Sequence, residues 1–248
     1  AIQKVSIAGQ GSVAVLMKEE AEAQIKLYDK KGKELANGKS YDNKGGIPIA
    51  VALSKDAKKM AISMIDVTGK EVGTTITFYN FGTVGQSQID NNVGTYNFTG
   101  TLIPEIKYVS EDRMLAFGTD RILIFEGSQK PEVAKEIELV GQVRSYFHNE
   151  KYLGIVYEQV QMEDAWHVQV MDMRGKTVME TDTEIEYNKI YFLPNNEMCI
   201  MNETACEIYT VLGTKKFTYT FDKEIYQIIS NGSGHNYIFV FKCIILLF

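Results

Sequence analysis

The chain carries three histidines, and their spacing does not build a metal or catalytic site. They are His148, His167 and His235, which fall in three separate stretches of the sequence. A zinc site needs several converging ligands, and two of them usually stand a few residues apart. The sequence also lacks a Gly-x-Ser-x-Gly elbow, a glycine-rich phosphate loop and a His-Glu-x-x-His motif. It therefore predicts no catalytic residue, no metal site and no cofactor.

Acidic side chains gather in three stretches, one of which also carries aromatic residues. The acidic residues are Glu19, Glu20, Glu22, Asp66, Glu71, Glu158, Glu163 and Asp164. Exposed tryptophan and tyrosine favour interfaces. One interpretation is a face that binds a partner or a cation through Tyr157, Glu158, Glu163, Asp164 and Trp166. The plainer interpretation is a solvated edge that keeps the protein soluble.

A second candidate set consists of the charged residues Glu105, Lys107 and Arg144. They stand in two short segments, 105–109 and 144–147, which we expect to be innermost strands of repeated units. A site there would line a central channel and would make the protein an enzyme or a small-ligand-binding protein. Converging carboxylate, histidine and arginine side chains would favour that function, whereas a plugged apolar channel would favour a scaffold.

Two cysteines, Cys199 and Cys206, could face each other across a hairpin that turns at Asn202 and Glu203. A disulfide between them would need a specific separation of their Cα and Cβ atoms. The simpler interpretation is that Cys199 is a small buried side chain, because free cysteine is commonly buried. With Cys243 as the third, the cysteines form no disulfide framework.

The elements that must position these residues are clearest in the stretch 47–82. An apolar run, 49–53, is followed by Ser54-Lys55-Asp56, whose serine and aspartate side chains favour a turn. The segments 59–65 and 74–81 read as two further strands, because the second alternates and is rich in β-branched and aromatic residues. The pattern predicts a large part of one β-propeller blade.

Two markers of this blade recur along the chain. Residues at the ends of third strands return about every 40–50 residues, which is the repeat length of four-stranded blades: Tyr28, Tyr79, Phe125, Met171 and Tyr209. A small residue stands between larger apolar residues in each second strand: Ala14, Ala61, Ala116, Gly154 and Cys199. Because blades pack face to face, a small side chain at one inward position permits their close approach.

The sequence therefore predicts an all-β fold, a propeller of about six visible four-stranded blade units, incomplete at one or both ends. We expect a single domain over residues 1–248. Its units are expected at 1–39, 46–97, 102–140, 142–186, 187–222 and 223–248.

Three segments resemble the repeat signature of quinoprotein-like propellers: Asp29–Leu35, Asp66–Val72 and Asp172–Val178. Members of those families carry a tryptophan after the Gly-Lys-Glu of the signature. Leu35, Val72 and Val178 occupy that position here, so the resemblance implies the fold and no quinone cofactor. The chain also resembles uncharacterised bacterial WD40-like propellers that carry an N-terminal membrane anchor. That resemblance implies an extracytoplasmic, cell-surface or membrane-anchored protein, and a cytoplasmic location stays open.

The charge and the apolar runs of the sequence argue against nucleic-acid binding and a membrane span. The net charge is −6 and no basic block stands out, which argues against nucleic-acid binding because phosphate-tracking surfaces need clustered lysine and arginine. No run of about 18 apolar residues is present, so the sequence itself predicts no membrane span. We expect a non-enzymatic binding or scaffold module with a protein or cell-envelope partner. It would reach the membrane only through an anchor that precedes Ala1.

Overall fold

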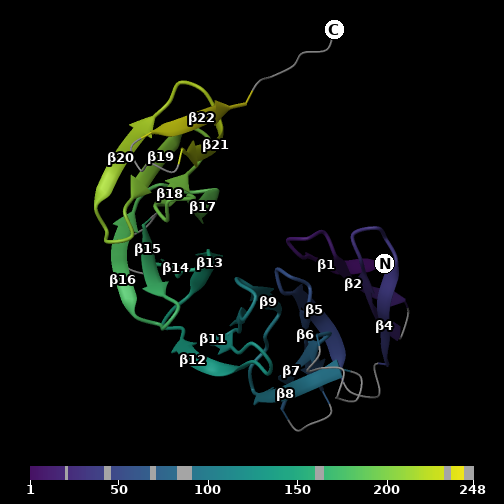
Figure 1. The fold of residues 1–248 in the computed structure, drawn as a ribbon. Coiled ribbons are helices and arrows are strands. Elements are labelled where there is room, and N and C mark those ends of the chain that lie inside the picture. The colour runs from purple at the N-terminus through teal and green to yellow at the C-terminus, as the bar shows by residue number, and fades with distance from the viewer. Residues whose placement is uncertain are drawn as a thin grey trace. The chain divides into compact units, whose positions relative to one another are not determined.

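The computed structural model describes residues 1–19, 22–41, 46–67, 71–82, 91–159, 165–231 and 236–242. The elements within them are β-strands (Figure 1). These strands form five four-stranded sheets and one two-stranded sheet, all antiparallel. The chain divides into two compact units, residues 1–139 (unit 1) and 140–248 (unit 2).

Unit 1 contains three sheets, which we call blades 1 to 3. Blade 1 comprises β1 (Ile2–Ile7), β2 (Val13–Glu19), β3 (Glu22–Tyr28) and β4 (Glu34–Tyr41). Blade 2 comprises β5 (Ile47–Leu53), β6 (Lys59–Asp66), β7 (Gly73–Asn80) and β8 (Asn92–Thr99). Blade 3 comprises β9 (Glu105–Tyr108), β10 (Arg113–Phe117), β11 (Arg121–Glu126) and β12 (Glu132–Glu138).

Unit 2 contains blades 4 to 6. Blade 4 comprises β13 (Val143–His148), β14 (Tyr152–Glu158), β15 (Trp166–Asp172) and β16 (Thr177–Thr183). Blade 5 comprises β17 (Lys189–Phe192), β18 (Met198–Met201), β19 (Ala205–Tyr209) and β20 (Lys215–Thr220). The described part of blade 6 comprises β21 (Ile225–Ser230) and β22 (Tyr237–Phe241). Strands pair in chain order, so the first strand of each blade is an edge strand.

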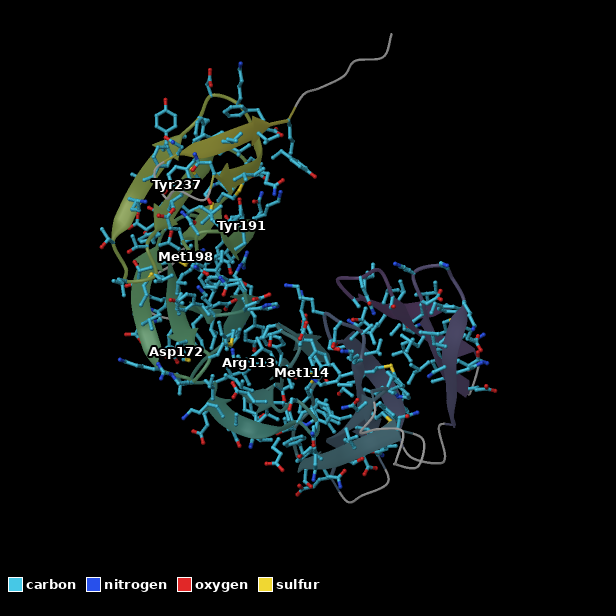
Figure 2. The ribbon with its side chains drawn as sticks, in the orientation of Figure 1. Arg113, Met114, Asp172, Tyr191, Met198 and Tyr237 are labelled. Atoms are coloured by element: carbon cyan, nitrogen blue, oxygen red, sulfur yellow. The ribbon has the colours of Figure 1, made fainter. Side chains whose placement is uncertain are left out.

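The hydrophobic core lies between neighbouring blades of each unit. In blade 3, the residues 114–117 of β10 and 122–125 of β11 are buried without interruption, as expected for strands that are covered on both faces. The fourth strand, β12, is mostly exposed. Met114 and Met198 occupy equivalent places at the start of two second strands and pack on the preceding blade (Figure 2).

The predicted turn at Ser54–Asp56 is confirmed. The Ser54 hydroxyl donates to the Asp56 carboxylate at 2.7 Å and accepts from the Lys59 N–H at 2.9 Å. The side chains therefore replace backbone partners in the connection between β5 and β6, which is the role that turn serine and aspartate residues commonly have.

The Asp-x-x-Gly-Lys signature is also a turn, and it joins third to fourth strands. The Asp29 carboxylate accepts from the N–H groups of Lys31 and Lys33, at 2.8 and 2.9 Å. Asp172 accepts from Arg174 and Lys176 in the same way. Gly32 and Gly175 have φ angles of +80° and +76°, which side chains disfavour, so glycine is needed at this position.

The Asp66 segment, which resembles this signature in sequence, lies in a different connection. Asp66 ends β6 and precedes β7, so it belongs to the connection between a second and a third strand. That connection lies at the opposite end of the meander from the turns at Asp29 and Asp172, because successive strands are antiparallel. Residues 68–70 of the expected signature lie outside the described residues.

Strand register places four of the five predicted small residues at one equivalent position. In each of these blades one residue of the second strand pairs with the recurring residue at the end of the third strand. The small residue comes directly after it in the sequence: Ala14, Ala61, Gly154 and Cys199. In blade 3 this position is Leu115, and Ala116 stands one residue further along. Because successive strand residues point to opposite faces, Ala116 packs on blade 2 instead. The prediction for Ala116 is therefore wrong.

Cys199 and Cys206 do not face each other. Cys206 pairs with Met201, whereas Cys199 pairs with Ile208, and both thiols are free and buried. The cause is the turn, because the Asn202 side-chain oxygen accepts from the N–H groups of Thr204 and Ala205 and shifts the register from the one expected. Burial raises the pKa of Cys199 to about 12 and that of Cys206 to about 11, so both thiols are unreactive at neutral pH.

A buried carboxylate links blades 5 and 6. Glu197 is 7% exposed; it accepts a hydrogen bond from the Tyr237 hydroxyl at 2.6 Å and pairs with the Lys216 ammonium. Burial alone would raise the pKa of Glu197, but the hydrogen bonds from Lys216 and Tyr237 outweigh it and lower that pKa below its ordinary value. Figure 2 labels Tyr237 on the blade 6 side of this contact.

The lowered pKa predicts a pH effect on stability. In the unfolded chain Glu197 has its ordinary pKa, about 4.3, so the folded carboxylate stabilises the protein above that value. The stabilisation is lost as the pH falls through the lower folded pKa. In urea unfolding at several pH values, Glu197→Gln is expected to be less stable than the wild type at pH 7, and this difference should shrink below about pH 4. The control Glu224→Gln changes a more exposed ion pair; an equal effect there would contradict the assignment.

Candidate functional site

The first candidate site is a cavity of about 340 Å³ in unit 1. It is lined by the neighbouring first strands β1, β5 and β9. β5 contributes the small residues 50–52, and as the edge strand of its sheet it has no ladder partner on its outer side. An uncovered strand edge presents backbone N–H and C=O groups to its surroundings.

Charged side chains from the two flanking strands border this cavity. Lys4 comes from β1, and Glu105 and Lys107 come from β9. All three are exposed, and within the part of the chain that the structure describes no ion pair involves any of them. Glu105 and Lys107 thus line one cavity together with Lys4, which the sequence analysis missed.

The second candidate site lies in unit 2 and consists of Arg144, Ser145, Trp166 and Tyr187, which we call the Arg144 cluster. The Arg144 guanidinium lies 4.2 Å from the centroid of the Trp166 ring and 5.6 Å from that of Tyr187. The two rings meet edge to face with centroids 6.0 Å apart. Such cation–π contacts hold an arginine side chain in place while its outer N–H groups stay available.

Two polar groups of the Arg144 cluster differ in how they are satisfied. The Tyr187 hydroxyl lies 2.7 Å from that of Ser145, and burial raises the pKa of Tyr187. The Trp166 indole N–H is buried and has no acceptor among the described residues. A buried donor without a partner is costly.

The predicted rim residues around Trp166 differ in exposure. Glu158 is half-buried and pairs across the ladder with Trp166. Tyr157 is only 7% exposed, so its ring is part of the core of blade 4 and does not present an exposed anchor. Burial raises the pKa of Tyr157. Glu163 and Asp164 lie outside the described residues.

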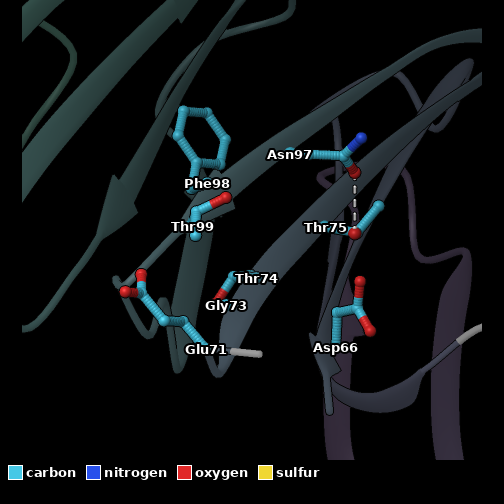
Figure 3. Close-up of a pocket in the computed structure, with 8 residues that line it drawn as sticks. All are labelled: Asp66, Glu71, Gly73, Thr74, Thr75, Asn97, Phe98 and Thr99. Carbon is cyan, nitrogen blue, oxygen red and sulfur yellow. Dashed lines mark hydrogen bonds between the residues drawn. The ribbon is translucent and has the colours of Figure 1, made fainter. Parts of the chain in front are cut away.

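The acidic residues of blade 2 border a smaller pocket of about 230 Å³. Figure 3 shows Asp66 and Glu71 on either side of Gly73 and Thr74, with the Thr75 hydroxyl donating to the Asn97 side-chain oxygen at 2.9 Å. Two carboxylates are too few for a stable metal site without further ligands. Across the described ranges, no group of three or more histidine, cysteine, aspartate or glutamate side chains is placed to hold a metal ion.

None of the described residues form a helix with the length and apolar character that crossing a bilayer requires.

Comparison with solved structures identifies the fold. The chain is similar to the Pan2 WD40 domain of Neurospora crassa, with a TM-score of 0.54 and 7% identity over 96% of this chain and 85% of that one. It is similar to the β-propeller domain of the Trilobed protease from Pyrococcus furiosus, with a TM-score of 0.55 and 11% identity over 92% and 75% of the two chains. BBS1N, solved in complex with ARL6DN, gives a TM-score of 0.52 and 12% identity over 92% and 69%.

At these identities the likeness shows the fold alone, and it confirms the prediction of an all-β propeller with WD40-like blades. No curated protein matches the chain. The model of a family of unknown function (DUF5711) matches residues 1–245, and the chain belongs to this family.

Proposed function

We propose that this protein is a non-enzymatic binding module and that unit 2 docks a protein partner through the Arg144 cluster. The observation that carries the proposal is the exposed Arg144 guanidinium held against the rings of Trp166 and Tyr187. Arginine, tryptophan and tyrosine supply a large share of the binding energy at protein interfaces. The outer N–H groups of Arg144 would be satisfied by backbone carbonyls of an extended segment of the partner.

The charges around the cluster favour a basic partner. Glu184 and Glu186 are exposed in the connection that leads to Tyr187, and the described residues offer neither of them an ion pair. Glu158 lies close enough for its charge to raise the pKa of Tyr187. Complementary charge directs the choice of partner and speeds association. The proposed ligand is therefore a lysine- or arginine-rich segment whose main chain accepts from Arg144.

The fold itself is compatible with more than one role. BBS1N was solved in complex with ARL6DN, whereas another similar propeller is a domain of a protease. Since function depends on the site and not on the fold, the proposal rests on the Arg144 cluster.

Trp166 is the single tryptophan of the chain, so intrinsic fluorescence reports directly on the proposed site. Short peptides of alternating lysine and serine are expected to change its emission in a saturable way, and peptides of alternating glutamate and serine are not. Arg144→Gln should weaken binding about tenfold or more, as for an interface hot spot.

The matched control is Arg174→Gln, which changes another exposed arginine of blade 4, at the turn between β15 and β16. It should bind the lysine peptide like the wild type. Equal binding of both peptides, or equal losses in the two variants, would contradict the proposed site.

We also propose that the protein works outside the cytoplasm, at the cell surface or on a membrane anchor, with a protein or cell-envelope component as its partner. The support is the resemblance of the Asp29 and Asp172 segments to those of anchored WD40-like propellers. Fractionation of the source cells with an antibody to this chain tests the location. Recovery with the envelope supports it, and recovery in the cytosol contradicts it.

A further inference from the structure

We propose that the cavity between β1, β5 and β9 in unit 1 binds a small organic anion that carries two anionic groups. The site is separate from the Arg144 cluster and does not depend on the protein-binding function. Its ligand class follows from the side chains at the rim, the backbone of the wall and the size of the hollow. A cavity of about 340 Å³ lies within the range of small-molecule sites.

The cavity brings two cationic side chains together in a chain of net negative charge. The net charge is −6. Some basic residues of unit 1 have carboxylate partners: Lys26 with Glu34, Lys58 with Asp56, Lys59 with Asp112, Arg113 with Glu126, and Arg121 with Asp120 and Glu136. Lys4 and Lys107 line the cavity from two different blades, and neither forms an ion pair with a carboxylate among the described residues. Two ammonium groups on opposite flanks suit a ligand with an anionic group at each end.

The wall between the two lysines is suited to the same ligand. β5 lines the cavity with Ala50, Val51 and Ala52 beside Leu53, and as an edge strand it has no ladder partner on its outer side. Strand edges of this kind form concave sites for anions through their N–H groups. The Leu53 N–H donates to the Ser6 hydroxyl at 2.9 Å, which ties β1 to β5 and fixes the spacing of the two strands.

Glu105 adds a preference within this ligand class. Its carboxylate accepts hydrogen bonds and repels further negative charge, and it lines the same cavity as Lys107. A dianion that also carries a hydroxyl or amino donor would pair with all three side chains. A hydroxylated dicarboxylate should therefore bind more tightly than the same dicarboxylate without the hydroxyl, because only the former offers Glu105 a hydrogen-bond donor.

Calorimetric titration of the whole chain tests the site with malate, succinate and pyrophosphate. Malate is expected to bind more tightly than succinate, and Lys4→Gln and Lys107→Gln should each weaken malate about tenfold. Tight binding of pyrophosphate with the same dependence on both lysines would identify phosphate as the source of the anionic groups and would support the site. Glu105→Gln should reduce the difference between malate and succinate.

The control variant is Lys31→Gln, an exposed lysine in the turn between β3 and β4 that does not line the cavity. It should bind malate like the wild type. The proposal is overturned if none of the three anions binds, or if Lys31→Gln weakens binding as much as the two cavity variants. Far-UV circular dichroism shows whether each variant is folded. Failure here leaves the lysine-peptide titration of unit 2 unaffected, so the two proposals are tested separately.

Discussion

Replacing Phe125 by alanine is expected to lower the free energy of unfolding by about 3–5 kcal/mol. Phe125 is fully buried on β11 of blade 3, and its ring packs against three rings of blade 2. The centroid distances are 5.0 Å to Phe78, 5.5 Å to Tyr96 and 6.3 Å to Phe98. The truncation removes buried apolar area, leaves a cavity and deletes three aromatic contacts.

Urea unfolding followed by circular dichroism measures this effect. Phe125→Leu keeps much of the side-chain volume. Apart from the loss of the aromatic contacts, it should lower the free energy of unfolding by less than about 1.5 kcal/mol. Leu35→Ala serves as the control, because Leu35 lies in the same unit and is 54% exposed; its expected cost is below about 1 kcal/mol. If Phe125→Ala lowers the free energy of unfolding by no more than Leu35→Ala does, the contact between blades 2 and 3 does not hold unit 1 together.

Turn chemistry and strand alternation could be predicted because both act over a few residues. The Ser54 and Asp56 side chains satisfy nearby backbone groups, and the structure has the turn where the sequence placed it. The signature at Asp29 and Asp172 is equally local. The similar segment that begins at Asp66 joins a second to a third strand, as the predicted strands 59–65 and 74–81 imply. The residues of a turn therefore do not by themselves determine which pair of strands it connects.

The error at Ala116 has a different cause. In Met114-Leu115-Ala116 the small residue is shifted by one position from those of the other blades. A shift of one residue moves a side chain to the other face of a sheet, and both faces of β10 are buried. A continuous apolar run does not indicate which of its residues face which side of the sheet. The register is therefore known only from the cross-strand pairs in the structure.

The sequence analysis assigned Arg144 and Trp166 to two different candidate sites, although the meander topology of a blade could have placed them together. Arg144 lies near the start of β13, and Trp166 begins β15. First and third strands of a meander run parallel, so their first residues lie at the same end of the blade. Tyr187 comes just before β17. What the sequence could not supply was the direction of the side chains, which decides that the guanidinium lies on the indole ring.

Replacing Gly154 by alanine is expected to destabilise the protein by about 1–3 kcal/mol, although three other blades hold alanine or cysteine at the equivalent position. A Cβ atom on Gly154 would lie on the ring of Phe147, far inside van der Waals contact. Phe147 is buried, and its ring packs against Phe192 with centroids 4.8 Å apart, so it cannot move aside freely. In blades 1 and 2 the residues paired with Ala14 and Ala61 are the small Ser6 and Ala52.

A double-mutant cycle distinguishes this clash with Phe147 from a general sensitivity of β14 to substitution. Phe147→Leu alone should be destabilising because it leaves space, and combining it with Gly154→Ala should cost less than the sum of the two single changes by about 1 kcal/mol or more. Gly38→Ala is the matched control, since the nearest atom to its new Cβ is the Ile25 carbonyl oxygen at 4.0 Å. That change should be neutral or slightly stabilising, because alanine restricts the unfolded chain more than glycine does. Additive costs in the cycle would show that Phe147 does not fill the space above Gly154, and the size of the side chain at this position would then need another cause.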